Sequence, residues 1–124
     1  IDDHYETFCS LSDKGVWMQI TAGSLTGRFG KGARYWAERM LDEGRVDILA
    51  TDAHHPQRRP PLLAEGREAA ARWVGAAEAA HLVETRPLGI LANLAPAAMP
   101  PRIRGARTSR QNDSLWRRLF GRAA

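Results

Sequence analysis

An Asp-x-His pair, Asp52 and His54, follows the apolar run Val46–Ala50, so a carboxylate and an imidazole stand where a buried strand would end. In an extended chain alternate side chains point to the same face, which would put these two roughly 6 to 7 Å apart. Oxygen and nitrogen donors at that spacing can converge on a metal ion, and they suit Zn, Mn or Fe. The pair predicts a metal site, but an Asp after a strand also commonly caps a turn and a His beside it is commonly just solvated.

Two strands and a helix are expected to position this pair. Val16–Thr21 and Val46–Thr51 are predicted strands with apolar side chains on both faces, as parallel strands require, although Asp47 interrupts the second. Ala22–Gly32 is rich in Gly and Ser and is predicted to be a loop. The amphipathic helix that follows it ends at Gly44. Its apolar stripe consists of Ala33, Trp36, Ala37, Met40 and Leu41.

Further helices are predicted on both sides of these strands. Tyr5–Lys14 is predicted to be the end of a helix. His55–Pro61 contains three Pro and is predicted to be a stiff loop. The later helices cover Leu62–Val74, Ala76–Glu84 after a break at Gly75, and Pro87–Asn93, with Thr85 as a cap and Asn93 as the end. This alternation is typical of an α/β fold. Two parallel strands leave edges that need partners, so Ile1–Leu94 is expected to be the last part of a larger domain.

Composition limits the possible functions. The chain has 124 residues, 44% of them hydrophobic, which is typical of a globular domain. No apolar run approaches the ~18 residues of a membrane span. Cys9 is the single cysteine and cannot form an internal disulfide, so a reducing, cytoplasmic setting is expected. The first residue is Ile and no signal peptide follows it, which suggests a cut rather than a biological start.

The last thirty residues form a basic tail, Ala95–Ala124. It carries seven Arg and one Asp, a net charge of +6, and leaves −2 for Ile1–Leu94. Three Pro and scattered Arg predict disorder through Arg110, followed by a short helix with Leu115, Trp116, Leu119 and Phe120 on its apolar side. Such a helix could bind a membrane surface peripherally, or it could bind an acidic partner or a polyanion. It could also be a loosely packed terminus with no binding role. The lack of interleaved aromatic residues argues against specific nucleic-acid recognition.

Three blocks together carry a family resemblance: Gln19–Lys31 (QITAGSLTGRFGK), Ala50–His54 (ATDAH) and Arg58–Pro61 (RRPP). They resemble the bacterial protein-tyrosine phosphatases of the polymerase-and-histidinol-phosphatase (PHP) type, which regulate capsule and exopolysaccharide synthesis. The resemblance runs from about Phe8 to Asn93. It implies the C-terminal portion of a distorted, mostly parallel (β/α)7-type PHP barrel, with divalent metals at the carboxyl ends of the strands.

The resemblance also implies roles for single residues. Asp52 and His54 match the family's last two metal ligands, and Arg59 matches an Arg that contacts the phosphate. His55 and Arg58 have no such match. The implied reaction is hydrolysis of protein phosphotyrosine by metal-activated water, with divalent ions, Mn first and Fe or Zn as alternatives. The implied partner is a tyrosine-phosphorylated protein such as a bacterial tyrosine kinase.

The family's remaining ligands are expected upstream of Ile1, because its His-x-His and His-Pro-Glu-Arg segments do not occur in these residues. Two ligands cannot hold a multinuclear centre, so the chain alone is expected to be inactive and poorly folded. Two other functions stay open. One is a PHP-type phosphoesterase acting on a small phosphate ester, and the other is a non-catalytic module that binds polyanions through its Arg-rich tail, with a salt-sensitive affinity.

Overall fold

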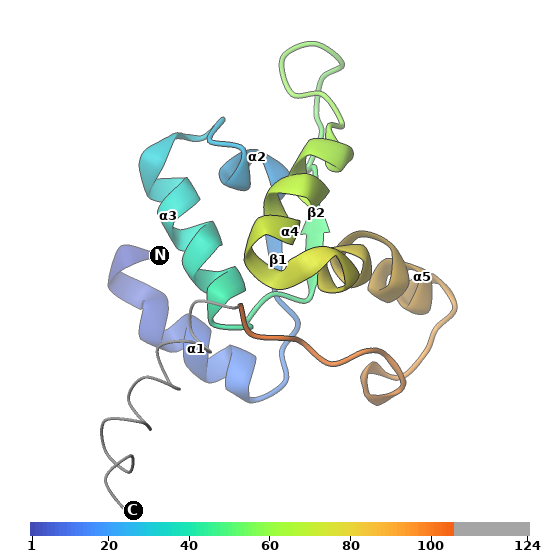
Figure 1. The fold of residues 1–124 in the computed structure, drawn as a ribbon. Coiled ribbons are helices and arrows are strands. Elements are labelled where there is room, and N and C mark those ends of the chain that lie inside the picture. The colour runs from blue at the N-terminus through green and yellow to red at the C-terminus, as the bar shows by residue number, and fades with distance from the viewer. Residues whose placement is uncertain (106–124) are drawn as a thin grey trace, which may run out of the picture.

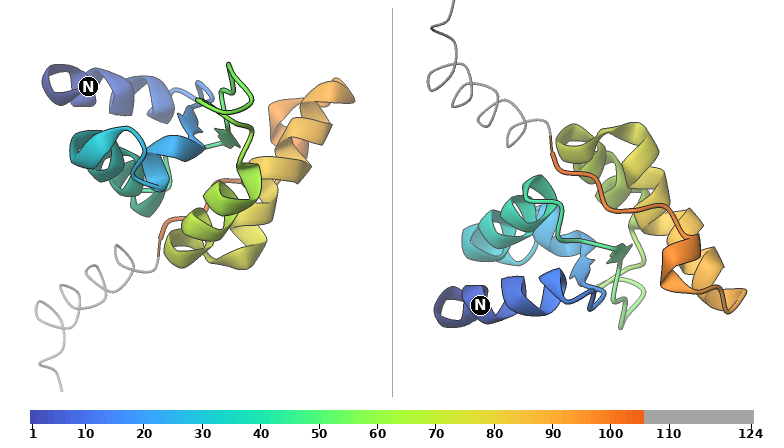
Figure 2. Two further views of the ribbon diagram at one scale, coloured as in Figure 1. Left: turned by 90° about the horizontal axis from the view of Figure 1, so that it is seen from above. Right: turned by 90° about the horizontal axis from the view of Figure 1, so that it is seen from below.

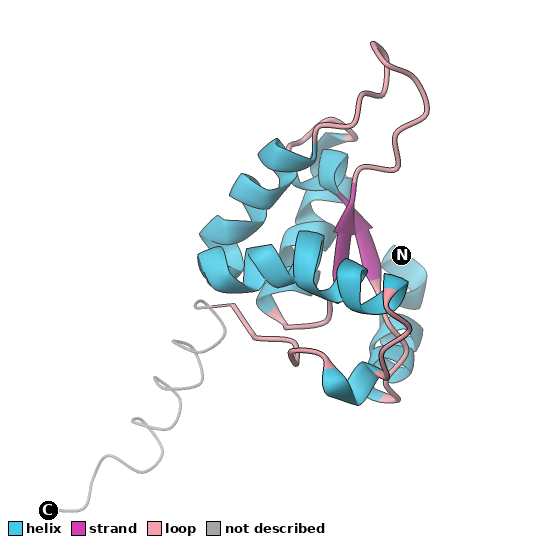
Figure 3. Cartoon of the chain, turned by 90° about the vertical axis from the view of Figure 1, so that its right-hand side faces the viewer, coloured by secondary structure: helices cyan, strands magenta, loops and turns pink. Residues whose placement is uncertain are grey.

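Two short parallel strands, β1 (Gln19–Thr21) and β2 (Ile48–Ala50), lie between the helices of the computed structural model, which describes residues 1–105 (Figure 1; Figure 3). Ile20 pairs with Leu49 in register, and both side chains are buried. The carboxyl ends of parallel strands meet at the same edge, so the segments that follow β1 and β2 lie beside each other. An α/β fold with a parallel pair is therefore confirmed, although β1 is shorter than predicted and Val16, ahead of it, is 45% exposed.

Asp47 explains why a carboxylate can interrupt a predicted buried strand. Its side chain is buried, and Oδ2 accepts a 2.8 Å hydrogen bond from the backbone N–H of Met18. In return, the backbone N–H groups of Asp47 and Ile48 donate to the Met18 carbonyl over 2.8 and 3.2 Å. Asp47 thus fixes the start of β2 against the residues that lead into β1.

The segment predicted as a loop after β1 is mostly helical. Helix α2 (Ala22–Leu25) follows the strand directly, and four residues separate it from α3 (Gly30–Asp42), so the prediction of a loop over Ala22–Gly32 is wrong at both ends. Burial explains the short helix, because Ala22 and Leu25 are 3% and 4% exposed. A Cβ atom at Gly66 would lie only 2.5 Å from the Cβ of Ala22, so this helix packs closely on the one that carries Gly66.

Helix α4 (Leu63–Ala80) lies across one face of the strand pair and continues through a π-helical turn, η2 (His81–Thr85), into α5 (Arg86–Leu91) (Figure 1). The predicted break at Gly75 is confirmed, since this residue has φ 85° and ψ 163° inside α4. Asn93 ends the last helix as predicted, with φ 54°. Thr85 does not cap α5, because its backbone is helical and its hydroxyl lies 3.0 Å from His81 Nδ1.

The predicted amino-terminal helix is confirmed as α1 (Tyr5–Asp13), which a 3-10 turn, η1 (Asp2–His4), precedes. Tyr5 packs on Trp36 of α3, with 4.7 Å between ring centroids, and donates a 2.7 Å hydrogen bond to Glu43. The predicted stripe on α3 is confirmed at Ala37, Met40 and Leu41, which are buried. These contacts hold α1 against α3.

Disorder was predicted from Ala95 onward, and the structure describes the first part of that tail, residues 95–105. They form a 3-10 turn, η3 (Pro96–Ala98), and a strap that crosses the underside of the molecule (Figure 2). Arg86 binds the carbonyls of Pro100 and Pro101 over 3.0 and 2.9 Å, and Arg102 binds the carbonyl of Ser12 over 3.0 Å. The rest of the basic tail, with the predicted helix around Leu115, lies outside the described residues. Within residues 1–105 no helix is long and apolar enough to cross a membrane.

Candidate functional site

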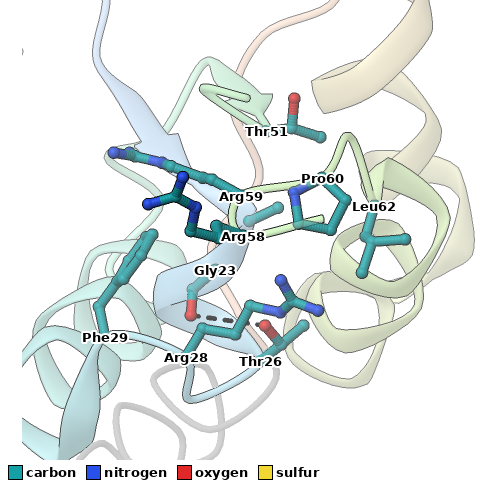
Figure 4. A pocket seen from close by; sticks show the side chains of 10 residues that line it. Gly23, Thr26, Arg28, Phe29, Thr51, Arg58, Arg59, Pro60 and Leu62 are labelled. Atoms are coloured by element: carbon teal, nitrogen blue, oxygen red, sulfur yellow. Dashed lines mark hydrogen bonds between the residues drawn. The ribbon is translucent and has the colours of Figure 1, made fainter. Parts of the chain in front are cut away.

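A partly open cavity of about 220 Å³ lies at the carboxyl ends of β1 and β2 (Figure 4). One wall comes from α2 and the turn after it, and the other from the loop that follows β2. The cavity is lined by Ala22, Gly23, Thr26, Arg28, Phe29, Thr51, Arg58, Arg59, Pro60 and Leu62. This is the edge at which the sequence predicted a site, because ligands of open α/β sheets bind beyond the carboxyl ends of the strands.

Asp52 turns the chain just after β2. Its φ of 50° lies in the left-handed region, which Asp tolerates better than most residues. The extended geometry assumed for Asp52 and His54 is therefore wrong. The two side chains are nevertheless close, with 3.8 Å between Asp52 Oδ1 and His54 Nδ1.

His54 presents one free ring nitrogen. Its Nδ1 lies 2.6 Å from the backbone carbonyl of Asp52, and a carbonyl can only accept, so Nδ1 carries the proton. The other nitrogen, Nε2, then has an available lone pair. A backbone carbonyl on Nδ1 is the usual way in which proteins orient a histidine that binds a metal through Nε2.

The loop after Asp52 closes on itself through His55. His55 and Arg59 form an antiparallel bridge, with N–H to carbonyl distances of 3.0 and 3.4 Å. The Nδ1 atom of His55 also accepts hydrogen bonds of 3.1 Å from the backbone of Gln57 and Arg58. His55 is thus a loop residue, as predicted, and its ring shapes the turn that presents Arg58 and Arg59.

Arg59 connects the two walls of the site. Its Nη2 donates to Oδ2 of Asp52, and its guanidinium lies 5.0 Å from the ring centroid of Phe29 on the opposite wall. The Nε atom is buried and has no hydrogen-bond partner among the described residues. A buried donor without a partner is costly, so an acceptor placed beside this atom would stabilise the Arg59 guanidinium.

Phe29 and Arg28 were not predicted as site residues, and Arg58 was set aside. Phe29 can approach because Gly23 has no side chain, since a Cβ at Gly23 would lie 2.7 Å from the ring. One signal was available in the sequence. The Gly-rich segment after the first strand and the Arg-rich segment after the second follow parallel strands, so they had to meet at one edge.

Asp52 and His54 both have donor atoms that could bind a metal ion. Oδ1 of Asp52 and Nε2 of His54 are free of hydrogen bonds from the described residues, and both side chains are about half exposed or more, at 46% and 63%. No group of three or more His, Cys, Asp or Glu that could hold a metal occurs within residues 1–105. The pair therefore fits two ligands of a larger set, with oxygen and nitrogen donors suited to Mn, Fe or Zn.

Comparison with known proteins supports a relationship over most of the described chain. The family described as "Capsular polysaccharide synthesis, CpsB/CapC" matches residues 1–92. "Tyrosine-protein phosphatase YwqE" of Bacillus subtilis (strain 168) is 39% identical over 49 residues, which are 40% of this chain and 19% of that protein. "Putative tyrosine-protein phosphatase CapC" of Staphylococcus aureus is 40% identical over 53 residues, 43% of this chain and 21% of that protein.

The matched segments cover only about a fifth of the length of these two curated relatives. No solved structure gave a significant match. The family match, by contrast, covers well over half of the chain, including both strands, the cavity walls, Asp52, His54 and Arg59. The chain therefore belongs to the CpsB/CapC family of capsular polysaccharide synthesis.

Proposed function

We propose that the protein to which these residues belong is a phosphatase that hydrolyses protein phosphotyrosine in the regulation of capsule or exopolysaccharide synthesis. The observation that carries this proposal is the position of Arg59. Its guanidinium borders the cavity beside Asp52 and His54, and its buried Nε has no hydrogen-bond partner among residues 1–105. An Arg fork with a free donor, next to two metal-type ligands, suits a phosphate monoester.

Each residue has a defined task in this proposal. Asp52 and His54 would hold divalent ions, Mn first and Fe or Zn as alternatives. When bound, such ions lower the pKa of water and offset charge on phosphoryl oxygens. Arg59 would orient the phosphate and stabilise its remaining oxygens. Cys9 lies on α1, away from the cavity lining, so no thiol nucleophile is assigned.

The proposal also concerns the rest of the domain and the partner. Within the described residues β1 and β2 pair only with each other, and parallel pairs need neighbours, so the outer edges of both strands would accept further strands of a (β/α)7-type PHP barrel. The partner would be a tyrosine-phosphorylated protein, such as a bacterial tyrosine kinase, in the cytoplasm. The 124-residue chain alone would be inactive because two ligands cannot hold a multinuclear centre.

The test is a phosphatase assay on the protein that carries this chain, with Mn²⁺ and a phosphotyrosine peptide. We expect turnover that a chelator abolishes and added Mn²⁺ restores. Histidinol phosphate is the comparison substrate, and faster turnover on it would favour a small phosphate ester instead. Failure of the metal-loaded protein to hydrolyse either substrate would reject a phosphatase function. Turnover by the purified 124-residue chain would contradict the proposed inactivity of that chain.

A further inference from the structure

Three arginines, Arg28, Arg58 and Arg59, border the cavity, and no Asp or Glu of residues 1–105 lines it (Figure 4). Arg28 extends from the turn after α2, whereas Arg58 and Arg59 extend from the opposite loop. Arg59 is partly neutralised by Asp52. The other two side chains form no hydrogen bond or ion pair with any residue of the described chain. The cavity thus holds two positive charges that residues 1–105 do not compensate.

The backbones that carry these two arginines are fixed. The N–H of Arg28 donates to the Gly23 carbonyl over 2.9 Å, after a turn in which Gly27 has φ 83°. The N–H of Arg58 donates to His55 Nδ1 over 3.1 Å. Because both turns are already ordered, binding a ligand would cost mainly the ordering of the two side-chain ends.

The size of the cavity limits the ligand. About 220 Å³ is below the ~300–1,000 Å³ of pockets that enclose a whole drug-sized ligand. It suits one or two side-chain groups rather than a free cofactor. Guanidinium groups bind carboxylates and phosphates through paired charge-assisted hydrogen bonds. The ligand chemistry is therefore an oxyanion on a side chain.

We propose that Arg28 and Arg58 form a second anion subsite, which binds an oxyanion on a residue close to the phosphotyrosine in the same substrate segment. This inference rests on the proposed function, in which Arg59 takes the phosphotyrosine itself. Arg28 and Arg58 are then specificity residues. The protein prefers phosphotyrosine that is flanked by an acidic side chain or by a second phosphotyrosine.

The experiment compares three peptides of equal length on the protein that carries this chain. One phosphotyrosine is flanked by Gln, by Glu, or by a second phosphotyrosine. The affinity of each peptide is measured by calorimetry on metal-free protein. The kcat/KM for each peptide is measured on the protein loaded with Mn²⁺. We expect the Glu peptide to bind about tenfold more tightly than the Gln peptide, as one charge-assisted hydrogen bond would give. A still tighter complex with the doubly phosphorylated peptide identifies phosphate as the natural second anion.

The variants R28Q, R58Q and R28Q/R58Q should bring the Glu to Gln binding ratio close to one. The matched control is R67Q, which removes an exposed Arg of α4 outside the cavity lining and should keep the ratio. Equal binding of the Glu and Gln peptides by wild type would overturn the proposal of a second anion subsite. A ratio of Glu to Gln peptide binding that stays unchanged in the double variant would overturn it as well. A Glu preference without hydrolysis under any metal would support the subsite while rejecting the proposed phosphatase.

Discussion

The guanidinium of Arg59 donates a hydrogen bond to the carboxylate of Asp52, so the residue proposed to bind phosphate contacts a residue proposed to bind metal. They are seven positions apart in the chain, and the closed turn between His55 and Arg59 brings them together. Oδ2 of Asp52 accepts this hydrogen bond, whereas Oδ1 accepts none from residues 1–105 and lies 3.8 Å from Nδ1 of His54. We therefore expect different effects from single substitutions: a change at Asp52 should weaken metal binding, and a change at Arg59 should weaken phosphate binding.

Loss of either proposed metal ligand should lower metal content and turnover together. Asp52→Ala and His54→Ala each remove one of the two donors in this chain, so elemental analysis after dialysis should show less bound metal than in wild type. His4→Ala is the control, because it removes an exposed imidazole outside the site. Unchanged bound metal in both site variants would refute the ligand assignment.

Arg59→Ala should act on the phosphate and leave the metal in place. Hydrogen bonds to charged groups contribute about 1.5–3 kcal/mol, so phosphate affinity and kcat/KM should fall by about ten- to a hundredfold. Arg59→Lys keeps the charge but loses the planar fork over Phe29, so it should recover only part of this loss. Metal loss equal to that of Asp52→Ala would show that Arg59 acts through the carboxylate instead.

Gly23→Ala should disturb Arg59 from the opposite wall of the cavity. The added Cβ would lie 2.7 Å from the Phe29 ring, so the ring must move and its contact with the guanidinium changes. We expect KM for a phosphotyrosine peptide to rise severalfold, since a cation–π contact contributes about 0.5–1 kcal/mol at an exposed site. Gly32→Ala is the matched control, because a Cβ there meets no atom of the described chain within 4 Å. An equal effect of both variants would exclude the role given to Phe29.

The sequence correctly predicted those parts of the fold that depend on residues close together in the chain. The stripe of α3, the break at Gly75 and the end at Asn93 each depend on neighbours in the chain, and all three are confirmed. Helix α2 was missed because its four residues have no period to detect, and its stability comes from burying Ala22 and Leu25.

Long-range polar contacts could not be predicted from local patterns. Arg86 has no exposed area, which composition would not predict for an Arg, and its hydrogen bonds to Pro100 and Pro101 hold the strap, for which disorder was predicted. The proximity of Asp52 and His54 was predicted, but for a wrong reason, since an extended strand was assumed where Asp52 has a positive φ. Arg59 was predicted by resemblance alone, and its role in phosphate binding stays a prediction.

Arg86→Ala should be among the most destabilising substitutions in this chain. Arg86 and Glu78 form a 2.7 Å ion pair and are 0% and 2% exposed. Removing one partner of a buried pair costs about 3–5 kcal/mol, because the other charge stays buried. Arg72→Ala breaks an exposed pair with Glu68 on the same helix and should cost about 0.5 kcal/mol or less. Denaturant unfolding of both variants measures the difference, and similar costs would contradict the argument.

Acid should weaken the contact between α1 and α3 through Glu43. Burial disfavours the charged carboxylate, but hydrogen bonds from Arg39, Tyr5 and Arg45 outweigh it and hold the pKa of Glu43 below its ordinary value of 4.5. A carboxyl with a lowered folded-state pKa contributes stability above its ordinary pKa, and that contribution is lost as the pH falls from there toward the folded pKa.

The matching measurement is the free energy of unfolding from pH 7 to pH 3 for wild type and Glu43→Gln. The variant should be less stable than wild type at pH 7 and should lose less stability in acid, so the two curves should approach each other below about pH 4.5. Glu84→Gln removes an exposed carboxyl of η2 and serves as the control, with a curve that follows wild type. A Glu43→Gln curve that stayed parallel to wild type over the whole range would show that the carboxylate charge does not hold α1 in place.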